Sequence, residues 1–184
     1  MATSAAVGIT PGTYEIDPVH SSVGFTVRHN VVAKFRGSFA DVAATLTVGD
    51  DGKLVLDGSV KVASVQVKEP NLAGHLQSPD FFDAERFPGI TFTSVSLEPA
   101  DDGTLTAEGD LTMKGVTKRI QATGELSHLP EDSYGGERAG VELTTTVNRH
   151  DYGIDWNATL PSGHGFALAE HVTLHVELEF KKEA

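Results

Sequence analysis

The sequence predicts a single all-β domain, an antiparallel β-barrel of about eight strands with one short helix in a crossover. Most of the chain alternates apolar and polar residues with a period of two, as strands do when one face turns to a core. Short turns rich in Gly and Asp join these stretches, and β-α-β spacing is absent, so we expect an antiparallel sheet. This many long strands in one domain of 184 residues favour closure into a barrel, which also removes exposed edges.

The first three strands are predicted in the N-terminal third of the chain. Every second residue of Ser22 to His29 falls on one apolar face, and the same alternation runs from Arg36 to Val48. The turn Gly49 to Gly52 supplies residues that tolerate positive φ, and Leu54 to Ala63 then resumes the alternation. This order is typical of hairpins.

The remaining strands are predicted in the second half of the chain. Gly89 to Glu98, Thr104 to Met113 and Val116 to Leu129 follow one another through short turns. Arg138 to Asn148 comes next, and His171 to Phe180 alternates most regularly, with apolar residues at every second position. We expect each of these stretches to turn one face to the barrel interior.

Two irregular stretches interrupt the alternation. The first runs from Glu69 to Pro88, where a proline near a helix start and Asn71 as a cap predict a short helix through His75 and Leu76. The Phe-rich segment after that helix needs apolar partners, so we expect this crossover to lie across an end or wall of the barrel. The second stretch, Arg149 to Leu168, reads as a long ordered loop near a rim.

Composition and charge exclude several classes of protein. Lys and Arg number 14 against 26 Asp and Glu, and the net charge of −12 repels phosphate backbones and anionic membrane surfaces, so no nucleic-acid partner is expected. Cysteine is absent, which removes disulfides, thiolate nucleophiles and Cys-based metal sites. No stretch approaches the roughly 18 apolar residues of a membrane-spanning helix, so we expect a protein that does not span a membrane.

The N-terminal segment carries no recognisable targeting signal. Met1 to Gly12 lacks both the positive charge and the apolar run of a secretory signal. We therefore expect a cytoplasmic protein in which residues 1–184 form one domain and residues 1–12 are loosely ordered.

The sequence contains no pattern that requires catalysis. The Gly-rich phosphate loops GxGxxG and GxxxxGK[ST] are both absent. Ser21 beside His20 and the run Ser162 to Gly165 bring hydroxyls near imidazoles, but no nucleophile elbow surrounds either serine. His171 and His175 share one strand face, where polar neighbours favour a solvated outer surface over a zinc site. We expect no catalytic residue, no metal and no cofactor other than a bound lipid.

Several basic residues are candidates for polar contacts. His20, His29 and His75 lie in or beside apolar segments, where a structural hydrogen bond is the commoner role, although together they could serve a polar headgroup. Four arginines could face a phosphate, but in this acidic chain each is expected to pair with a carboxylate, as Asp151 near Arg149 suggests. The four are Arg28, Arg36, Arg86 and Arg149.

Four ordered segments spread over nearly the whole chain carry distinctive motifs. Tyr14 to His29 places Asp, His-Ser, Phe and His at defined spacings, and His75 to Asp83 is followed by Phe87 to Phe92. Two shorter segments are Leu111 to Lys118 and Asn148 to Ile154. Together they resemble the YceI-like family of polyisoprenoid-binding, lipocalin-like barrels.

The resemblance implies an extended barrel whose interior accepts an isoprenoid chain. Periodicity alone leaves open whether the interior is a packed core or a cavity. A long chain would gain roughly 0.8 kcal/mol per buried CH₂ without strong polar contacts. The predicted ligand-binding residues are Phe25, Val27, His29, Phe35, His75, Leu76, Phe81, Phe82, Phe92, Arg149 and Trp156.

The function expected from the resemblance is non-catalytic binding, storage or transport of a long apolar isoprenoid-type lipid, either polyprenyl or quinone-like. One alternative is an enzyme that acts on such a lipid through His20, His29 or His75, since imidazole titrates near neutrality. The other is a structural module whose apolar strands form a homodimer interface. Many relatives are exported to the periplasm, which contrasts with the N-terminus of this chain.

Overall fold

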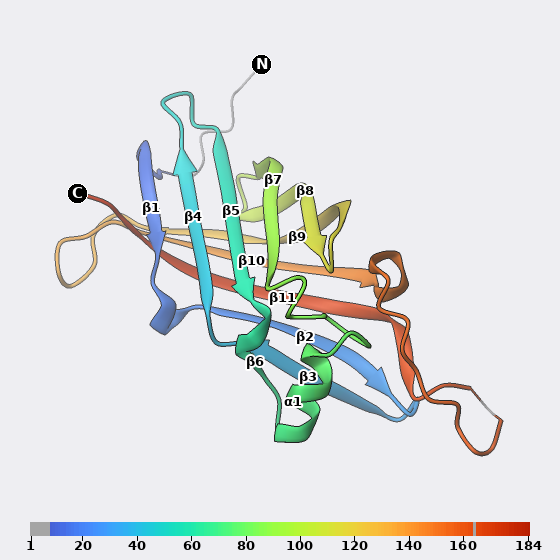
Figure 1. Ribbon diagram of the computed structural model, residues 1–184. Helices are drawn as coiled ribbons and strands as arrows, with labels where there is room; N and C mark the ends of the chain where they lie inside the picture. Colours follow the sequence, from blue (N-terminus) through green and yellow to red (C-terminus); the bar gives the residue numbers. More distant parts are fainter. Residues whose placement is uncertain (1–7, 164) are drawn as a thin grey trace.

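The computed structural model describes residues 8–163 and 165–184 as an all-β structure with one short α-helix (Figure 1). Single 3-10 turns at Pro18–His20, Val62–Ser64 and Arg149–Tyr152 interrupt the connections. The strands are β1 (Gly12–Ile16), β2 (Ser22–His29), β3 (Ala33–Phe39), β4 (Val42–Val48), β5 (Leu54–Lys61), β6 (Val65–Gln66), β7 (Gly89–Pro99), β8 (Thr104–Met113), β9 (Val116–Leu129), β10 (Arg138–Asn148) and β11 (Leu168–Lys182).

Eight of these strands close into an antiparallel barrel, which confirms the predicted fold. The order around the barrel is β1-β4-β5-β7-β8-β9-β10-β11, and β11 pairs again with β1. Consecutive strands are joined mostly as hairpins, such as β8 to β9, which pair from Thr104↔Glu125 to Met113↔Val116. The front and rear strands cross at a steep angle in Figure 1, as expected for a strongly twisted small barrel.

The long strand β11 is shared between the barrel wall and an extension of it. Its C-terminal end, Phe180 to Lys182, pairs with β1, whereas Leu168 to Glu177 pairs with β2. The strands β2, β3 and β6 therefore continue the sheet beyond the point where β1 closes the barrel. The sheet is therefore closed by β1 at the C-terminal end of β11 and continues into β2 and β3 at the other end.

The stretch Arg36 to Val48 was predicted as one strand, and that prediction is wrong. The structure divides it into β3 and β4, with a bend at Ala40 and Asp41. Hydrogen bonds from the Ala40 amide to the Ser64 carbonyl (3.0 Å) and from the Asp41 amide to the Ser64 hydroxyl (3.0 Å) stabilise this corner. No Gly or Pro marks it, because partners distant in sequence hold the backbone.

The helix predicted in the crossover is present as α1 (Pro70–Gln77). Its cap is Glu69, whose carboxylate accepts a hydrogen bond from the Leu72 amide (2.8 Å), so the assignment of Asn71 as the cap is wrong. Pro70 occupies the first helical position, which places the capping side chain one residue before it. Among the described residues, no helix combines the length and apolarity needed to cross a lipid bilayer.

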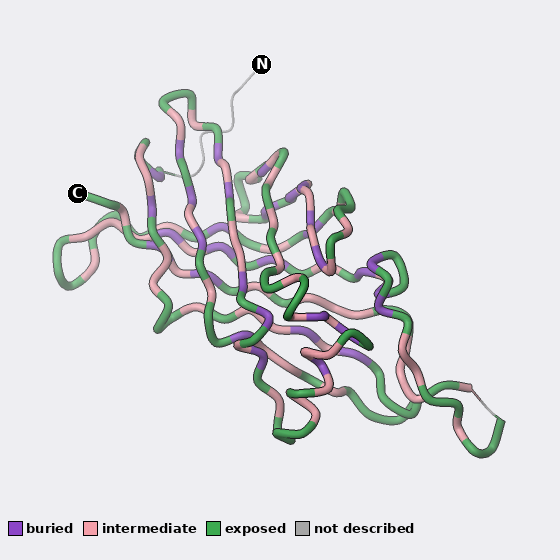
Figure 2. The backbone as a smooth tube through the Cα atoms, in the orientation of Figure 1, coloured by how far each residue is buried: buried purple, intermediate pink, exposed green. Residues whose placement is uncertain are grey.

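Two groups of buried side chains fill the interior, and Figure 2 shows buried residues alternating with exposed ones along the strands. The first group lies at the β1 end and includes the fully buried Tyr14 and Phe180. The second lies at the β2-β3 end, where Phe25, Phe39 and the crossover meet. Between them the inward faces of the strands border the site described below.

The predicted loosely ordered segment 1–12 falls partly outside the described residues, which begin at residue 8. Within the described part, Ile9 is buried in the first group of core residues. Thr10 donates hydrogen bonds to Glu137, and Tyr14 donates to the Thr10 carbonyl (2.8 Å). His128 also contacts Glu137 through Nε2 (2.8 Å), so this carboxylate ties the segment to the barrel.

Candidate ligand-binding site

The barrel encloses a cavity of about 570 Å³. Strands β2 to β5 and β7 to β11 contribute to its wall, together with α1 and the segment after it. Enclosed sites for small organic molecules usually measure roughly 300–1,000 Å³, so this volume suits a ligand.

The cavity wall is almost entirely apolar because the strand alternation turns polar residues outward. Small residues, including Ala44, Gly58 and Ala122, occupy wall positions where larger side chains would fill the interior. Among the described residues, seven wall positions carry a polar or charged side chain: His29, Lys34, Ser59, His75, Thr91, Thr145 and Arg149.

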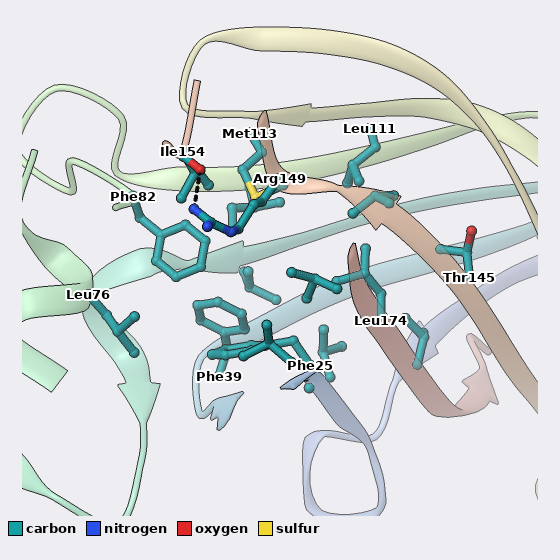
Figure 3. A pocket seen from close by; sticks show the side chains of 18 of the residues that line it. Phe25, Phe39, Leu76, Phe82, Leu111, Met113, Thr145, Arg149, Ile154 and Leu174 are labelled. Atoms are coloured by element: carbon teal, nitrogen blue, oxygen red, sulfur yellow. Dashed lines mark hydrogen bonds between the residues drawn. The ribbon is translucent and has the colours of Figure 1, made fainter. Parts of the chain in front are cut away.

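An aromatic group forms one side of the cavity. The Phe25 ring lies 5.9 Å from Phe39 and 6.4 Å from Phe35, measured between ring centroids. Phe82, from the segment that follows α1, adds its edge to both Phe25 (6.2 Å) and Phe39 (5.9 Å). Figure 3 shows Phe82, Phe25 and Phe39 around the same space. The crossover therefore closes the cavity through an aromatic contact.

A second aromatic group joins the crossover to the loop after β10. The His75 ring lies 4.9 Å from both Phe81 and Trp156, and Phe81 lies 5.3 Å from Trp156. His75 Nε2 contacts the Asp80 carboxylate at 3.0 Å. The two irregular stretches of the sequence thus meet at one place on the cavity wall, as predicted for a crossover that lies across the barrel.

Arg149 is the one arginine in the cavity wall and is only 4% exposed. Its guanidinium donates hydrogen bonds to the carbonyls of Ile154 (2.7 Å), Trp156 (2.9 Å) and Ala169 (2.9 Å). Figure 3 shows the bond to Ile154 beside Phe82. Burial lowers the Arg149 pKa. The expected carboxylate partner is therefore wrong, because three backbone carbonyls hold the charged group.

The remaining Arg149 nitrogen, Nη2, is buried without a hydrogen-bond partner among the described residues. The neighbouring Tyr152 hydroxyl is in the same condition, and burial raises the pKa of Tyr152 to about 12. Buried polar groups are usually satisfied, so an unused donor in an apolar wall is a place where a ligand oxygen would be favourable.

Exposed residues of the cavity wall lie beside the β2-β3 hairpin, and we infer an opening of the cavity there. His29 and Ala33 form the pair nearest the hairpin turn, and both are exposed while they line the cavity. Leu168, which pairs with His29, lines the cavity from β11. We call this region the mouth, defined by His29, Ala33 and Leu168.

The structure places all of the predicted ligand-binding residues in the wall of this one cavity. They are Phe25, Val27, His29, Phe35, His75, Leu76, Phe81, Phe82, Phe92, Arg149 and Trp156. His20 lies elsewhere, in a second pocket that Arg138 also lines, with its Nδ1 3.0 Å from Asp17 Oδ2. The interpretation that His20, His29 and His75 serve one headgroup together is therefore wrong.

Several wall residues were missed by the sequence interpretation. Most are strand residues in the inward phase, and Figure 3 labels Phe39, Leu111, Met113, Thr145 and Leu174 among them. Ile154, also labelled there, comes from the loop after β10. Their alternation gave the necessary signal, but alternation does not distinguish wall from packed core. Small wall residues such as Ala122 carried no signal.

The other predicted polar residues are outside the cavity wall or bonded within the protein. His171 and His175 are exposed, and His175 contacts Thr26 at 3.1 Å. Arg86 pairs with Asp83 at 3.5 Å. The Ser21 hydroxyl donates a hydrogen bond to the Glu179 carbonyl and accepts one from the Glu179 amide, so it is held by the backbone. Residue 164 of the run from Ser162 to Gly165 lies outside the described residues.

A closed antiparallel barrel with an internal apolar cavity and an open end defines a cavity-bearing, lipocalin-like β-barrel. Residues 14–180 match the YceI-like domain. The chain therefore belongs to the YceI-like family.

Similar proteins span nearly the same length. A UPF0312 protein of Staphylococcus aureus is 32% identical over 170 residues, which cover 91% of this chain and 96% of the relative. The solved YceI protein of Campylobacter jejuni is 26% identical, covers 85% of this chain and 90% of that one, and has a TM-score of 0.72.

More distant structures share the fold. Burkholderia cenocepacia BcnA is 17% identical with a TM-score of 0.76, over 89% of this chain and 98% of that one. A structure described as a polyisoprenoid binding domain from Saccharophagus degradans is 14% identical with a TM-score of 0.68, over 95% and 100%.

Proposed function

We propose that this protein binds a long apolar isoprenoid-type lipid, polyprenyl or quinone-like, inside its barrel and stores or carries it without chemical change. The observation that carries the proposal is the apolar cavity of about 570 Å³ with an opening at one end. The polyisoprenoid binding domain from Saccharophagus degradans, which has a similar fold, adds support for this class of ligand.

Burial in the cavity supplies the affinity. Each CH₂ group moved from water to the wall contributes roughly 0.8 kcal/mol, and a chain of several prenyl units contains many such groups. Loss of translational and internal freedom offsets part of this gain. The apolar wall therefore selects for length and apolarity, and the unused Arg149 Nη2 donor adds a preference for an oxygen acceptor at the headgroup.

The positions and contacts of the histidines favour a binding role over catalysis. Those in the wall are His29, at the exposed mouth, and His75, which contacts Asp80 and two aromatic rings. General acid or base catalysis needs a side chain within hydrogen-bond reach of the reacting atom and a second group that works with it. His20 is not in the wall, which removes one of the three histidines from the catalytic alternative.

Trp156 provides a direct test, because it is the only tryptophan of the chain and it lines the cavity. Quinones quench indole fluorescence on contact, so titration with a short-tailed ubiquinone should quench Trp156 in a saturable way. Addition of an unlabelled polyprenol should then restore the emission by competition. Quenching that rises linearly, without saturation, would contradict binding inside the cavity.

A further inference from the structure

The turn of the β2-β3 hairpin exposes apolar side chains to solvent. Val31 is 68% exposed and Val32 is 82% exposed, and the neighbouring Phe166 is 61% exposed. The Asn30 amide donates to the Ala167 carbonyl (2.8 Å), which holds the hairpin turn against the segment that carries Phe166. We call Val31, Val32 and Phe166 the docking tip.

The backbone of the hairpin turn is strained at one of these valines. Asn30 has φ 48° and Val31 has φ 65°. Asn tolerates this left-handed region, but a β-branched residue in it is a genuine outlier. Consecutive positive φ values suit the twist of a tight hairpin, but Gly or Asn would adopt them at lower cost than valine. A strained residue with an exposed apolar side chain is typical of a functional site.

Three cations flank the docking tip on one face of the hairpin. Arg28 lies directly opposite Lys34, and Arg36 lies opposite Thr26 one step further from the turn, so the register places all three on the same strand face. Among the residues that the structure describes, none of the three forms an ion pair with a carboxylate. Like charges directly opposite each other destabilise a sheet unless an anion lies between them.

These cations stand out because the protein as a whole is acidic, with a net charge of −12. The acidic residue of the adjoining segment of β11 is Glu170. Charges separated by more than roughly 8–10 Å are screened at physiological salt, so a surface that approaches the hairpin meets the local cations rather than the net charge.

The docking tip lies beside the mouth of the cavity. The last pair of the hairpin, His29 and Ala33, lines the cavity, and the three residues between them include Val31 and Val32. In Figure 1 the hairpin between β2 and β3 projects at the lower right, away from both termini. An object that contacts the docking tip therefore lies across the opening.

We propose that the docking tip inserts into the surface of an anionic lipid bilayer and sets the cavity mouth against the membrane. The valines and Phe166 enter the interface, while Arg28, Lys34 and Arg36 contact lipid phosphates. A lipid of very low solubility then passes between bilayer and cavity without crossing bulk water. This route rests on the proposed lipid binding, whereas the membrane contact itself is a separate property of the surface.

Cosedimentation with vesicles tests the membrane contact. The full-length protein should pellet with vesicles of phosphatidylcholine mixed with phosphatidylglycerol, and binding should weaken with pure phosphatidylcholine or with raised salt. Each cation removed near an anionic surface weakens binding about fivefold, so Arg28→Gln with Lys34→Gln should weaken it at least about tenfold. Lys53→Gln with Lys118→Gln, two exposed lysines elsewhere, is the matched control.

A valine outside the docking tip provides the control for its apolar side chains. Val32 and Val19 are both 82% exposed, and Val19 lies on the short turn before β2. Val32→Ser should weaken vesicle binding severalfold, whereas Val19→Ser should leave it unchanged. Equal effects of the two substitutions would overturn the proposal. A wild-type protein that stays in the supernatant with anionic vesicles would also overturn it, and an acidic protein would then be the partner of the three cations.

The proposed lipid binding and the proposed membrane contact can be contradicted independently of each other. Saturable quenching of Trp156 by a quinone dispersed in detergent, with no vesicle binding, would overturn the docking proposal while the function stands. Vesicle binding that responds to Val32→Ser, with no quinone quenching, would keep the docking surface and remove the proposed cargo.

Discussion

Glu137 is a carboxylate that is mostly buried at the β1 end of the barrel, with a side chain 12% exposed. Burial raises its pKa, but hydrogen bonds, including those from Thr10 and His128, outweigh that effect and lower the pKa from 4.5 to about 2. A lowered pKa means that the ionised form stabilises the fold. This stability is present in full above about pH 5 and is lost as the pH falls from 4.5 towards 2.

Glu137→Gln should therefore lower the free energy of unfolding by about 2 kcal/mol at pH 7. Urea unfolding at a series of pH values measures this loss, and the difference between the two proteins should shrink as the pH approaches 2. Glu142→Gln, an exposed change on β10, should have little effect at either pH. A loss for Glu137→Gln that stays constant with pH would contradict the assignment.

Individual site residues were predictable to different degrees. Inward-facing residues such as Phe25 and Val27 follow from strand alternation, and Arg149 follows from the family motif. The bonding of Arg149 could not be predicted, because its three carbonyl partners come from two segments that only the fold brings together. His20 does not contact a headgroup in the cavity, because the turn at Pro18–His20 places its ring beside Asp17, in the pocket that Arg138 lines.

Among the elements, the crossover after α1 covers one side of the cavity, and we expect it to limit the release of a bound ligand. Phe82 contacts Phe25 and Phe39 only through the faces and edges of rings, and these contacts are lost when the segment moves. The bend between β3 and β4 shows why the strand boundaries could be predicted only in part. The inward positions change from odd-numbered residues, such as Phe35 and Phe39, to even-numbered ones, such as Val42 and Ala44. The prediction of one strand followed only the second phase, and the bonds to Ser64 hold the corner between the two.

Phe82→Ala should speed release of a bound quinone about tenfold or more, because the crossover loses its aromatic contact with the barrel. Recovery of Trp156 fluorescence after mixing with excess empty vesicles measures the release rate. The control is Phe87→Ala, since Phe87 packs with Arg86 (5.1 Å from the guanidinium carbon to the ring centroid) and does not line the cavity. Similar release rates for the two variants would show that the crossover does not limit access.

At the scale of the whole molecule, the sequence predicted a closed antiparallel barrel but left its interior undetermined. Alternation fixes which face of each strand turns inward, and a packed core satisfies that pattern as well as a cavity does. The difference depends on where the register places small wall residues side by side, as it does for Gly58 opposite Ala44.

Thr144 and Thr145 are adjacent on β10 and face opposite sides of its wall. Thr145 lines the cavity, where Figure 3 shows it beside Leu174, whereas Thr144 is exposed on the outer surface. Thr145→Trp therefore narrows the cavity, and Thr144→Trp adds the same side chain outside it. Comparison of these two variants distinguishes a block of the cavity from other effects of a tryptophan added to β10.

Native mass spectrometry of these two variants, after incubation with a polyprenol, tests the central claim most directly. The wild-type protein and Thr144→Trp should carry one added polyprenol mass, and the affinity of Thr145→Trp for the polyprenol should fall at least about tenfold. Circular dichroism should show the same β structure in all three proteins. Equal occupancy of the two variants, with the fold intact, would contradict a ligand held inside the barrel.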